Sequence, residues 1–253
     1  MPTYAALVAD LRAAGCVFAE DEARVLLESA SSAAELEAMT ARRVEGEPLE
    51  YVVGWAEFCG LRIGVDATVF IPRPRTEFLV AVAVELTPPS AVVVDLCCGS
   101  GALGLALAAS VPDIELLASD IDDAAVACAR RNGVAVVQGD LFDALPDRLR
   151  GRVDVLLANT PYVPTDELDL MPREARLYEA AVTLDGGSDG LDLQRRVAAG
   201  AAHWLAPGGS VLVEASERQA STAAAIFEAA GLSARVHYDD DRDATVIVGT
   251  RPQ

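Results

Sequence analysis

The apolar positions of residues 88–253 follow two alternating patterns. Short apolar runs rich in Val, Leu and Ile are followed by longer segments in which apolar residues recur at helical spacing. The short runs predict strands at residues 91–95, 114–120, 134–138, 153–158, 209–215, 232–238 and 244–250. The longer segments predict helices at residues 101–110, 122–132, 190–205 and 217–230. Such alternation predicts an α/β fold in which helices cover both faces of a parallel sheet.

The last two predicted strands are joined differently from the others. Only the acidic turn from Asp239 to Asp243 separates them. A hairpin at this turn makes the final strand antiparallel to its neighbour. We therefore expect a seven-stranded sheet whose last strand is antiparallel.

The first 48 residues show a helical pattern throughout. They are rich in Ala and predict helices near residues 4–14, 20–29 and 33–43. The sequence from Ser32 to Glu35 fits a capping box before the third helix, and Gly46-Glu47-Pro48 ends the region. These residues carry no obvious chemistry, so we expect a small N-terminal helical domain at residues 1–48.

A mixed segment connects this helical region to the α/β part. Apolar runs predict short strands at residues 51–53, 55–58 and 61–63, with a turn at Gly60. Prolines stiffen the end of the segment, and a helix near residues 75–86 follows. We expect a β-hairpin linker at residues 49–74 and an α/β domain at residues 75–253.

Composition narrows the classes of partner. The chain has 253 residues, of which 52% are hydrophobic, so a sizeable core is available. The formal net charge of −19 makes nucleic acid an unfavourable partner, because a nucleic-acid footprint needs clustered Lys and Arg. No apolar run approaches the length of a membrane span, and Asp10 and Arg12 interrupt the N-terminus. We therefore expect neither a membrane partner nor a signal peptide.

The five cysteines and two histidines show no metal-binding pattern. The cysteines form no C-x-x-C pair and have no metal-ligand spacing. Reduced, buried cysteines in a cytoplasmic protein are the simplest interpretation. We accordingly expect no metal site, and we expect a monomer.

A glycine-rich turn follows the first strand of the α/β part. Residues 92–104 read Val-Val-Val-Asp-Leu-Cys-Cys-Gly-Ser-Gly-Ala-Leu-Gly, which is typical of a strand, a tight loop and a helix. Gly99 and Gly101 allow a ligand to approach the backbone, and Gly104 allows the helix to pack close to the strand. The free N–H groups of such a loop point toward the ligand.

The carboxylate of Asp95 indicates which ligand this loop accepts. Residues 99–104 also fit the G-x-G-x-x-G pattern of dinucleotide-binding proteins, which is a weak signal. A carboxylate at the strand end repels a diphosphate, whereas it suits an ammonium or a sulfonium group. S-adenosylmethionine carries both groups and no phosphate, and the stretch resembles the cofactor loop of class I methyltransferases. The alternative is a structural turn that binds no ligand.

Two further acids follow the next two predicted strands. Asp120 can accept hydrogen bonds from both ribose hydroxyls of a nucleoside, as a carboxylate does in other doubly wound folds. Asp140 can accept one from an adenine amino group, with Leu141 and Phe142 packing the ring. Helix capping is the alternative for each acid, and we prefer it for Asp122 and Asp123. We prefer ligand binding for Asp120 and Asp140, because ligands bind at the carboxyl ends of such strands.

The fourth strand of the α/β part runs into Asn159-Thr160-Pro161-Tyr162. This sequence resembles the Asn-Pro-Pro-Tyr motif of methyltransferases that modify a planar amide or amino nitrogen. The side-chain oxygen of Asn159 and the backbone carbonyl of Thr160 can each accept one N–H, which aims the nitrogen lone pair at the methyl group. Pro161 stiffens the turn and Tyr162 covers the planar group, so catalysis is mainly alignment. An ordinary strand-to-loop turn is the alternative.

Together these motifs resemble those of the protein-(glutamine-N5) methyltransferases that modify peptide chain release factors. The resemblance runs from about residue 42 to the C-terminus. Two segments are more specific to that family than the glycine loop is. The first is Arg-Arg-x-x-Gly-Glu-Pro-x-x-Tyr-x-x-Gly-x-x-Glu-Phe-x-Gly at residues 42–60. The second is Phe-Ile-Pro-Arg-Pro-Arg-Thr-Glu at residues 70–77, which resembles the Phe-x-x-Pro-Arg-Pro-x-Thr-Glu segment of the family. The resemblance implies the Rossmann-like, seven-stranded sheet of class I methyltransferases.

The resemblance also implies a role for each candidate residue. It implies that Phe70 lines the glutamine pocket and that residues 159–162 hold the amide. It implies that the N-terminal helices help to dock the release factor. The implied cofactor contacts, beside Asp95, are Cys97, Cys98, Gly99, Ser100, Gly101, Asp120, Asp140, Leu141 and Asn159.

The chain departs from the family pattern at four places. Thr160 replaces the first proline of the motif, and Arg75 replaces the usual acid before Thr-Glu. Ala180 follows Glu179 where the family has proline, and Glu214 is followed by Ala-Ser instead of a hydrophobic residue and Gly. We therefore expect methyl transfer from S-adenosylmethionine to a protein glutamine, while the protein acceptor stays open.

Three other functions remain as alternatives. An adenine-amino methyltransferase of DNA or RNA acts on a similar planar amino group, but the net charge disfavours it. A closed lid over the pocket, rather than an open trough, would favour a small-molecule methyltransferase. A non-catalytic protein of this fold requires a pocket filled by side chains.

Overall fold

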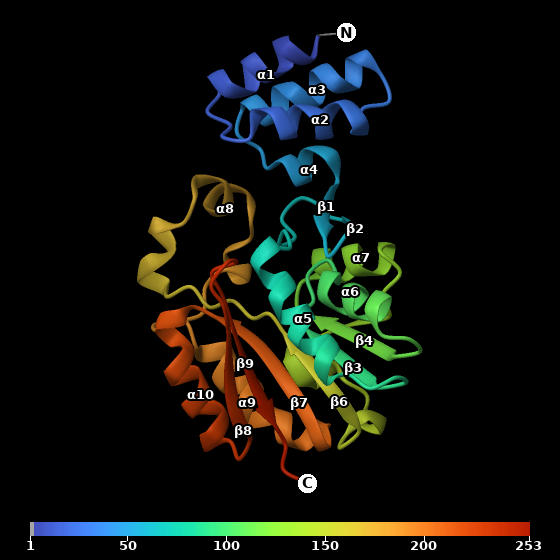
Figure 1. The fold of residues 1–253 in the computed structure, drawn as a ribbon, viewed down its shortest axis with the longest axis vertical. Helices are drawn as coiled ribbons and strands as arrows, with labels where there is room; N and C mark the ends of the chain where they lie inside the picture. Colours follow the sequence, from blue (N-terminus) through green and yellow to red (C-terminus); the bar gives the residue numbers. More distant parts are fainter. Residues whose placement is uncertain (1–2) are drawn as a thin grey trace.

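The computed structural model describes residues 3–253, and its centre is a seven-stranded sheet (Figure 1). The strands lie in the order β5-β4-β3-β6-β7-β9-β8. Their bounds are Val92–Leu96 for β3, Glu115–Asp120 for β4, Val136–Gln138 for β5, Val153–Ala158 for β6, Leu205–Ala215 for β7, Ser233–Asp239 for β8 and Ala244–Thr250 for β9. Strand β9 is antiparallel to β7 and β8. The predicted sheet with an antiparallel final strand is therefore confirmed.

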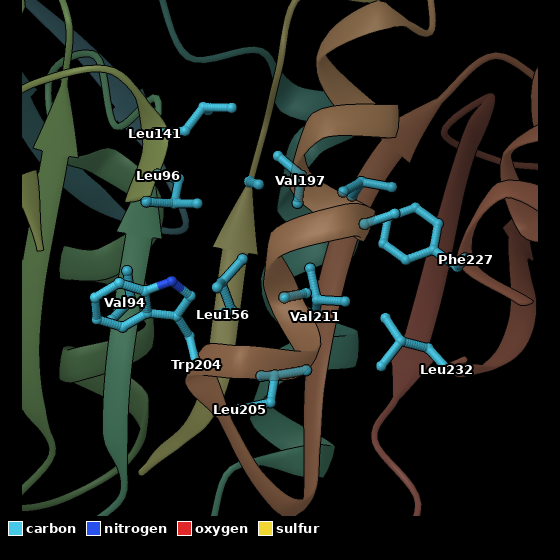
Figure 2. Packing of buried hydrophobic residues seen from close by; sticks show 14 of the residues in the cluster. Val94, Leu96, Leu141, Leu156, Val197, Trp204, Leu205, Val211, Phe227 and Leu232 are labelled. Carbon is cyan, nitrogen blue, oxygen red and sulfur yellow. The ribbon is translucent and has the colours of Figure 1, made fainter. Parts of the chain in front are cut away.

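Helices pack on both faces of this sheet. The helices are α5 (Glu77–Leu86), α6 (Ala102–Ser110), α7 (Asp123–Arg131), α9 (Asp192–Trp204) and α10 (Ala220–Ala229). On one face, Val197 and Trp204 of α9 and Phe227 of α10 pack against strand residues such as Leu156 and Val211 (Figure 2). Helices α5 and α6 cover the other face with a second apolar cluster. Burial on both faces explains why the strands read as continuous apolar runs.

The sheet register brings three strand ends together. Leu96 of β3 lies opposite Ser119 of β4 on one side and opposite Ala158 of β6 on the other. The residues that follow these three parallel strands therefore share one edge of the sheet. In an open α/β sheet, this carboxyl edge is where ligands bind.

Three N-terminal helices form a cluster of their own at the top of Figure 1. They are α1 (Tyr4–Ala13), α2 (Ala19–Ser29) and α3 (Ala33–Val44), close to the predicted ranges. Leu7, Leu11, Leu26 and Leu36 are fully buried between them. The amphipathic spacing of these leucines thus corresponds to a real core.

The segment after α3 corrects one sequence prediction. Residues 51–53, predicted as a strand, belong to the short helix α4 (Leu49–Val53). Pro48 precedes this helix, and Gly54, with φ +81°, ends it in the left-handed conformation. These local start and stop signals outweigh the strand preference of the paired valines. The hairpin that follows, β1 (Trp55–Phe58) and β2 (Leu61–Gly64), is antiparallel as predicted.

An irregular segment connects β6 to α9 along the carboxyl edge of the sheet. It contains the 3₁₀ turns η4 (Thr165–Leu170) and η5 (Ala181–Thr183) and the helix α8 (Arg173–Tyr178), which the sequence patterns did not predict. An ion pair of 2.7 Å between Arg43 of α3 and Glu174 connects it to the N-terminal helices. The remaining 3₁₀ turns are Pro74–Thr76, Leu141–Ala144, Asp147–Leu149 and Glu217–Gln219. Within residues 3–253, no helix is long and apolar enough to cross a membrane.

Candidate active site

The glycine loop between β3 and α6 is held in a tight turn. Cys97, Gly99 and Gly101 have φ values of +54°, +55° and +80°. The Cys98 N–H donates to the carbonyl of Ser119 at 3.1 Å, which fixes the loop against the end of β4. Residues 97–100 line a cavity of about 280 Å³ at the carboxyl edge of the sheet.

The three glycines of the loop serve different purposes. A Cβ on Gly99 would meet only Phe70, at 3.9 Å, so this glycine faces the cavity. A Cβ on Gly101 would lie 2.7 Å from a methyl group of Val134, and one on Gly104 would lie 2.9 Å from Leu116. Gly101 and Gly104 are therefore required for packing, and Gly101 does not line the cavity.

Asp95 lies beneath the loop and not in the cavity wall. The residue is 1% exposed, and its Oδ2 accepts a hydrogen bond of 3.0 Å from the Gly104 N–H. Burial raises the pKa of Asp95 to about 7. The geometry thus gives Asp95 a contact with the first turn of α6, and its predicted contact with a cationic ligand stays a prediction.

Asp120 and Asp140 both line the cavity. Asp120 accepts hydrogen bonds from the Gly99 N–H at 2.8 Å and from the Asp122 N–H at 3.0 Å. Asp140 pairs with Arg196 of α9 at 2.8 Å. A carboxylate has about four lone-pair sites, so both acids keep acceptor capacity toward the cavity. Asp122 caps α7 through the Ala124 N–H, as predicted.

The adjoining aromatic residue lies elsewhere than expected. Leu141 lines the cavity, but Phe142 is not among the described residues that do so. The Phe142 ring stacks on Trp204, with centroids 6.0 Å apart. Phe142 therefore contributes to the core between the sheet and α9.

The motif after β6 forms another wall of the same cavity. Asn159, Thr160, Pro161 and Tyr162 all line it, together with Phe70. Thr160 is 1% exposed, and its hydroxyl has no hydrogen-bond partner among the described residues. The structure thus brings every sequence-predicted site residue to this cavity except Asp95, Gly101 and Phe142.

Tyr162 is held at both ends by residues that the sequence did not place in the site. Its hydroxyl donates to Oε1 of the buried Glu214 at 2.6 Å, and its carbonyl accepts from Gln219 at 2.9 Å. Burial and the adjacent Glu214 charge raise the pKa of the Tyr162 hydroxyl. Tyr162 is therefore a neutral, fixed wall residue.

Two arginines of residues 70–77 stack on aromatic residues of the cavity. The Arg73 guanidinium lies 5.1 Å from the Phe70 ring centroid and pairs with the buried Glu179. Arg75 lies 5.7 Å from the Tyr162 ring centroid and pairs with Glu214 at 3.2 Å. Each arginine and its acid are more than 100 residues apart in the chain. No local sequence pattern predicts these pairs, and the only signal for the arginines is the family-like segment at residues 70–77.

The donors around the cavity are largely paired with acids, which disfavours a diphosphate. The Gly99 N–H, which a phosphate would use, already donates to Asp120. Arg73, Arg75 and Arg196 each pair with an acid. Burial also raises the pKa of the Cys97 and Cys98 thiols, so both are neutral and neither is an activated nucleophile. Within residues 3–253 there is no group of His, Cys, Asp and Glu suited to a metal ion.

Known proteins resemble the chain over most of its length. A family model described as "Methyltransferase small domain" matches residues 74–188. A release factor glutamine methyltransferase of Geobacter sulfurreducens is 37% identical over 219 residues, covering 84% of this chain and 76% of that protein. One of Streptomyces coelicolor is 40% identical over 197 residues, covering 75% and 70%. A 4-amino-L-phenylalanine/4-methylamino-L-phenylalanine methyltransferase of Streptomyces pristinaespiralis is 37% identical over 203 residues, covering 75% and 68%.

Solved structures share the fold. A methyltransferase from Pyrococcus furiosus has a TM-score of 0.59 at 16% identity and covers 86% of this chain and 100% of its own. A chain of the E. cuniculi Mtq2–Trm112 complex has a TM-score of 0.55 at 20% identity and covers 74% and 99%. At these identities the likeness concerns the fold alone.

Proposed function

The chain belongs to the release factor glutamine methyltransferase family, and from this premise we propose that it methylates the side-chain amide nitrogen of a glutamine in a protein. We propose S-adenosylmethionine as the methyl donor and a peptide chain release factor as the protein acceptor. The observation that carries the proposal is geometric. The glycine loop and residues 159–162 form walls of one cavity.

The cavity wall suits the proposed cofactor. Asp120 and Asp140 offer acceptor oxygens for the hydroxyl and amino groups of an adenosine. Gly99 leaves space where any other residue would place a Cβ toward Phe70. When bound, the cofactor supplies an electrophilic methyl group.

Residues 159–162 are suited to orient an amide. The nitrogen of a glutamine amide is a poor nucleophile because its lone pair is delocalised over the carbonyl. The Asn159 side-chain oxygen and the Thr160 carbonyl each accept a hydrogen bond from one of its two N–H groups, which fixes the plane of the amide. The Tyr162 ring, held by Glu214 and Gln219, limits the amide to a slot of fixed orientation. Alignment of this kind lowers the barrier without a strong general base.

The protonation states agree with catalysis by alignment. Burial raises the pKa of the Tyr162 hydroxyl and of the Cys97 and Cys98 thiols, so none of them is a base near neutral pH. The methylated amide nitrogen loses one proton after its new bond forms, and water can accept it. The residues of this chain therefore act by binding and orienting the methyl donor and the amide.

A labelling experiment tests the proposed function. The protein is incubated with methyl-labelled S-adenosylmethionine and, separately, with a release factor, with the same release factor lacking the glutamine of its Gly-Gly-Gln sequence, and with 4-amino-L-phenylalanine. We expect label on the intact release factor only. The last acceptor is included because one relative is named for it. Label on the free amino acid and none on the release factor contradicts the proposal.

A further inference from the structure

Arg75 differs from the other arginines of the cavity because its terminal nitrogens bind no acid among the described residues. Arg73 and Arg196 each use a terminal nitrogen to bind an acid. Arg75 binds Glu214 through Nε at 3.2 Å. The Tyr162 hydroxyl also lies beside this guanidinium and contributes to raising its pKa. Within the described range 3–253, the two terminal nitrogens bind no acid. Four N–H donors in one plane therefore remain available on a side chain that is 45% exposed.

The position of Arg75 defines where these donors point. Arg75 lines the cavity described above and also a second, more open hollow of about 440 Å³. Tyr162, Val163 and Met171 line both spaces as well, so the hollow continues outward from the acceptor side of the cavity. A chain segment whose glutamine enters the cavity beside Tyr162 extends past Arg75 into this hollow.

A carboxylate is the group that matches these donors. The planar edge of a guanidinium binds a carboxylate through two parallel hydrogen bonds. The hollow has an apolar side formed by Pro164, Leu170, Met171 and Pro172, and a charged side where Arg218 pairs with Glu167 at 3.0 Å. Because Glu167 already has this partner, Arg75 is, in the part of the chain that the structure describes, the cation of the hollow that binds no acid through its terminal nitrogens. The net charge of −19 disfavours a polyanion, so a single carboxylate fits better than a nucleic acid.

Prior pairing with Glu214 does not prevent Arg75 from binding a second acid. Arg43 of the same chain binds Glu22 through Nε at 2.6 Å and Glu174 through a terminal nitrogen at 2.7 Å. Glu214 also shares its charge with the Tyr162 hydroxyl, 2.6 Å away. An arginine that bridges two carboxylates thus already exists in this fold.

We propose that Arg75 is a specificity-determining residue that binds a carboxylate of the methyl acceptor. This inference rests on the proposed function and makes it narrower. The protein acceptor presents an Asp or Glu side chain near the methylated glutamine, and this side chain lies against Arg75 in the hollow.

Peptide acceptors test this proposal. Ala-rich peptides with a central Gly-Gly-Gln carry one Glu at each flanking position in turn, and each has a counterpart with Ala at that position. At one or more positions we expect the Glu peptide to have a kcat/KM about tenfold higher than its counterpart, mainly through KM. In Arg75→Gln, the ratio of kcat/KM on the Glu peptide to kcat/KM on its Ala counterpart should fall to within about twofold. Because this ratio is taken within one variant, any loss of activity common to both peptides cancels. Arg75→Lys should keep only part of the preference.

A control variant separates a specific effect of Arg75 from the general effect of removing one positive charge. Arg195 is a surface residue of similar exposure, 42% of its side chain, and it pairs with Asp189. It lines neither space. Arg195→Gln should keep the full preference for the Glu peptide. Equal activity on all peptide pairs in the wild type, a preference that survives in Arg75→Gln, or an equal loss in Arg195→Gln overturns the proposal.

Calorimetry separates this inference from the proposed function. Each peptide is titrated into the protein with S-adenosylhomocysteine present. Methylation without any preference for Glu leaves the proposed function standing and overturns the role of Arg75. Arg75-dependent binding of a Glu peptide without methylation supports the role of Arg75 and overturns the proposed function. If no peptide binds and none is methylated, both are overturned.

Discussion

Asn159 is the residue on which the proposed chemistry depends most. Its side-chain oxygen is the acceptor that orients the nucleophilic nitrogen. Asn159→Ala should therefore lower kcat by roughly two orders of magnitude, the cost of a misaligned reactant. Asn159→Asp keeps an acceptor oxygen and should recover part of the loss. Both are measured as methyl transfer to one acceptor, with S-adenosylmethionine affinity measured by calorimetry. Full activity in Asn159→Ala contradicts the proposed role.

The buried carboxyl group of Asp95 should make the free energy of unfolding depend on pH. Burial raises its pKa to about 7, from an ordinary value of 3.8. Between these values the folded state holds a proton that the unfolded chain has lost, so this group makes the protein less stable as pH rises through that window. Asp95→Asn has no titration there. The free energy of unfolding of the variant relative to wild type should rise from pH 4 to pH 7 and then level off.

Urea unfolding at a series of pH values measures this difference. The wild type and Asp95→Asn share all other titrating groups, so their contributions cancel in the comparison. A difference that does not change with pH shows that the Asp95 carboxylate is charged in the folded protein.

Sequence patterns identified only part of the site, because some of its residues are positioned by contacts between distant parts of the chain. Phe70, Asp120 and Asn159 follow from local motifs, and the structure brings them to one cavity. The role of Glu214 as the partner of Arg75 and Tyr162 depends on contacts across 139 and 52 residues of sequence. No local pattern carries such a contact. The burial of Asp95 under α6 was equally unpredictable, because tertiary packing sets it and the neighbouring residues in the sequence do not.

The glycine loop is the element that positions the cofactor side of the site. Gly101, at φ +80°, has Val134 at 2.7 Å from the position of an added Cβ, whereas Gly133, at φ +87°, has nothing within 4 Å. Gly101→Ala should therefore destabilise the protein by about 1–2 kcal/mol from backbone strain, with a further loss from the clash. Gly133→Ala carries the strain without the clash.

Chemical denaturation of these variants separates strain from clash. Gly101→Ala should be less stable than Gly133→Ala, and adding Val134→Ala should recover part of the difference. If the two glycine variants lose equal stability, the contact between Gly101 and Val134 is not required.

Elements were predictable where periodicity was long and bounded by clear signals. The strands β3 to β9 and helices α5 to α10, apart from α8, correspond to apolar runs and helical repeats in the sequence. The short helix α4 and the irregular segment that contains α8 do not. Single turns of helix offer too few residues for a period to emerge, and their caps and tertiary contacts decide the conformation.

In the whole molecule, the fold brings the proposed cofactor side and the proposed acceptor side to one edge of the sheet. The proposed cofactor side comes from the residues that follow β3, β4 and β5. The proposed acceptor side comes from the residues that follow β6 and from residues 70–77, and Glu214 of β7 holds Tyr162 there. The order of strands puts β3 next to β6, so the two sides share a cavity. The sequence predicted this sheet from alternation, but not the segment of residues 163–184 that borders the acceptor side, because that segment has no regular pattern.

The position of the methyl group on the acceptor is the decisive readout for the proposed methylation of a protein glutamine. A release factor is incubated with the protein and S-adenosylmethionine and then analysed by fragmentation mass spectrometry. We predict one added methyl group on the side-chain nitrogen of the glutamine in Gly-Gly-Gln, and none when Asn159→Ala replaces the wild type under the same conditions. A methyl group on any other residue, or an unmodified release factor beside an active enzyme that methylates another acceptor, would contradict the account.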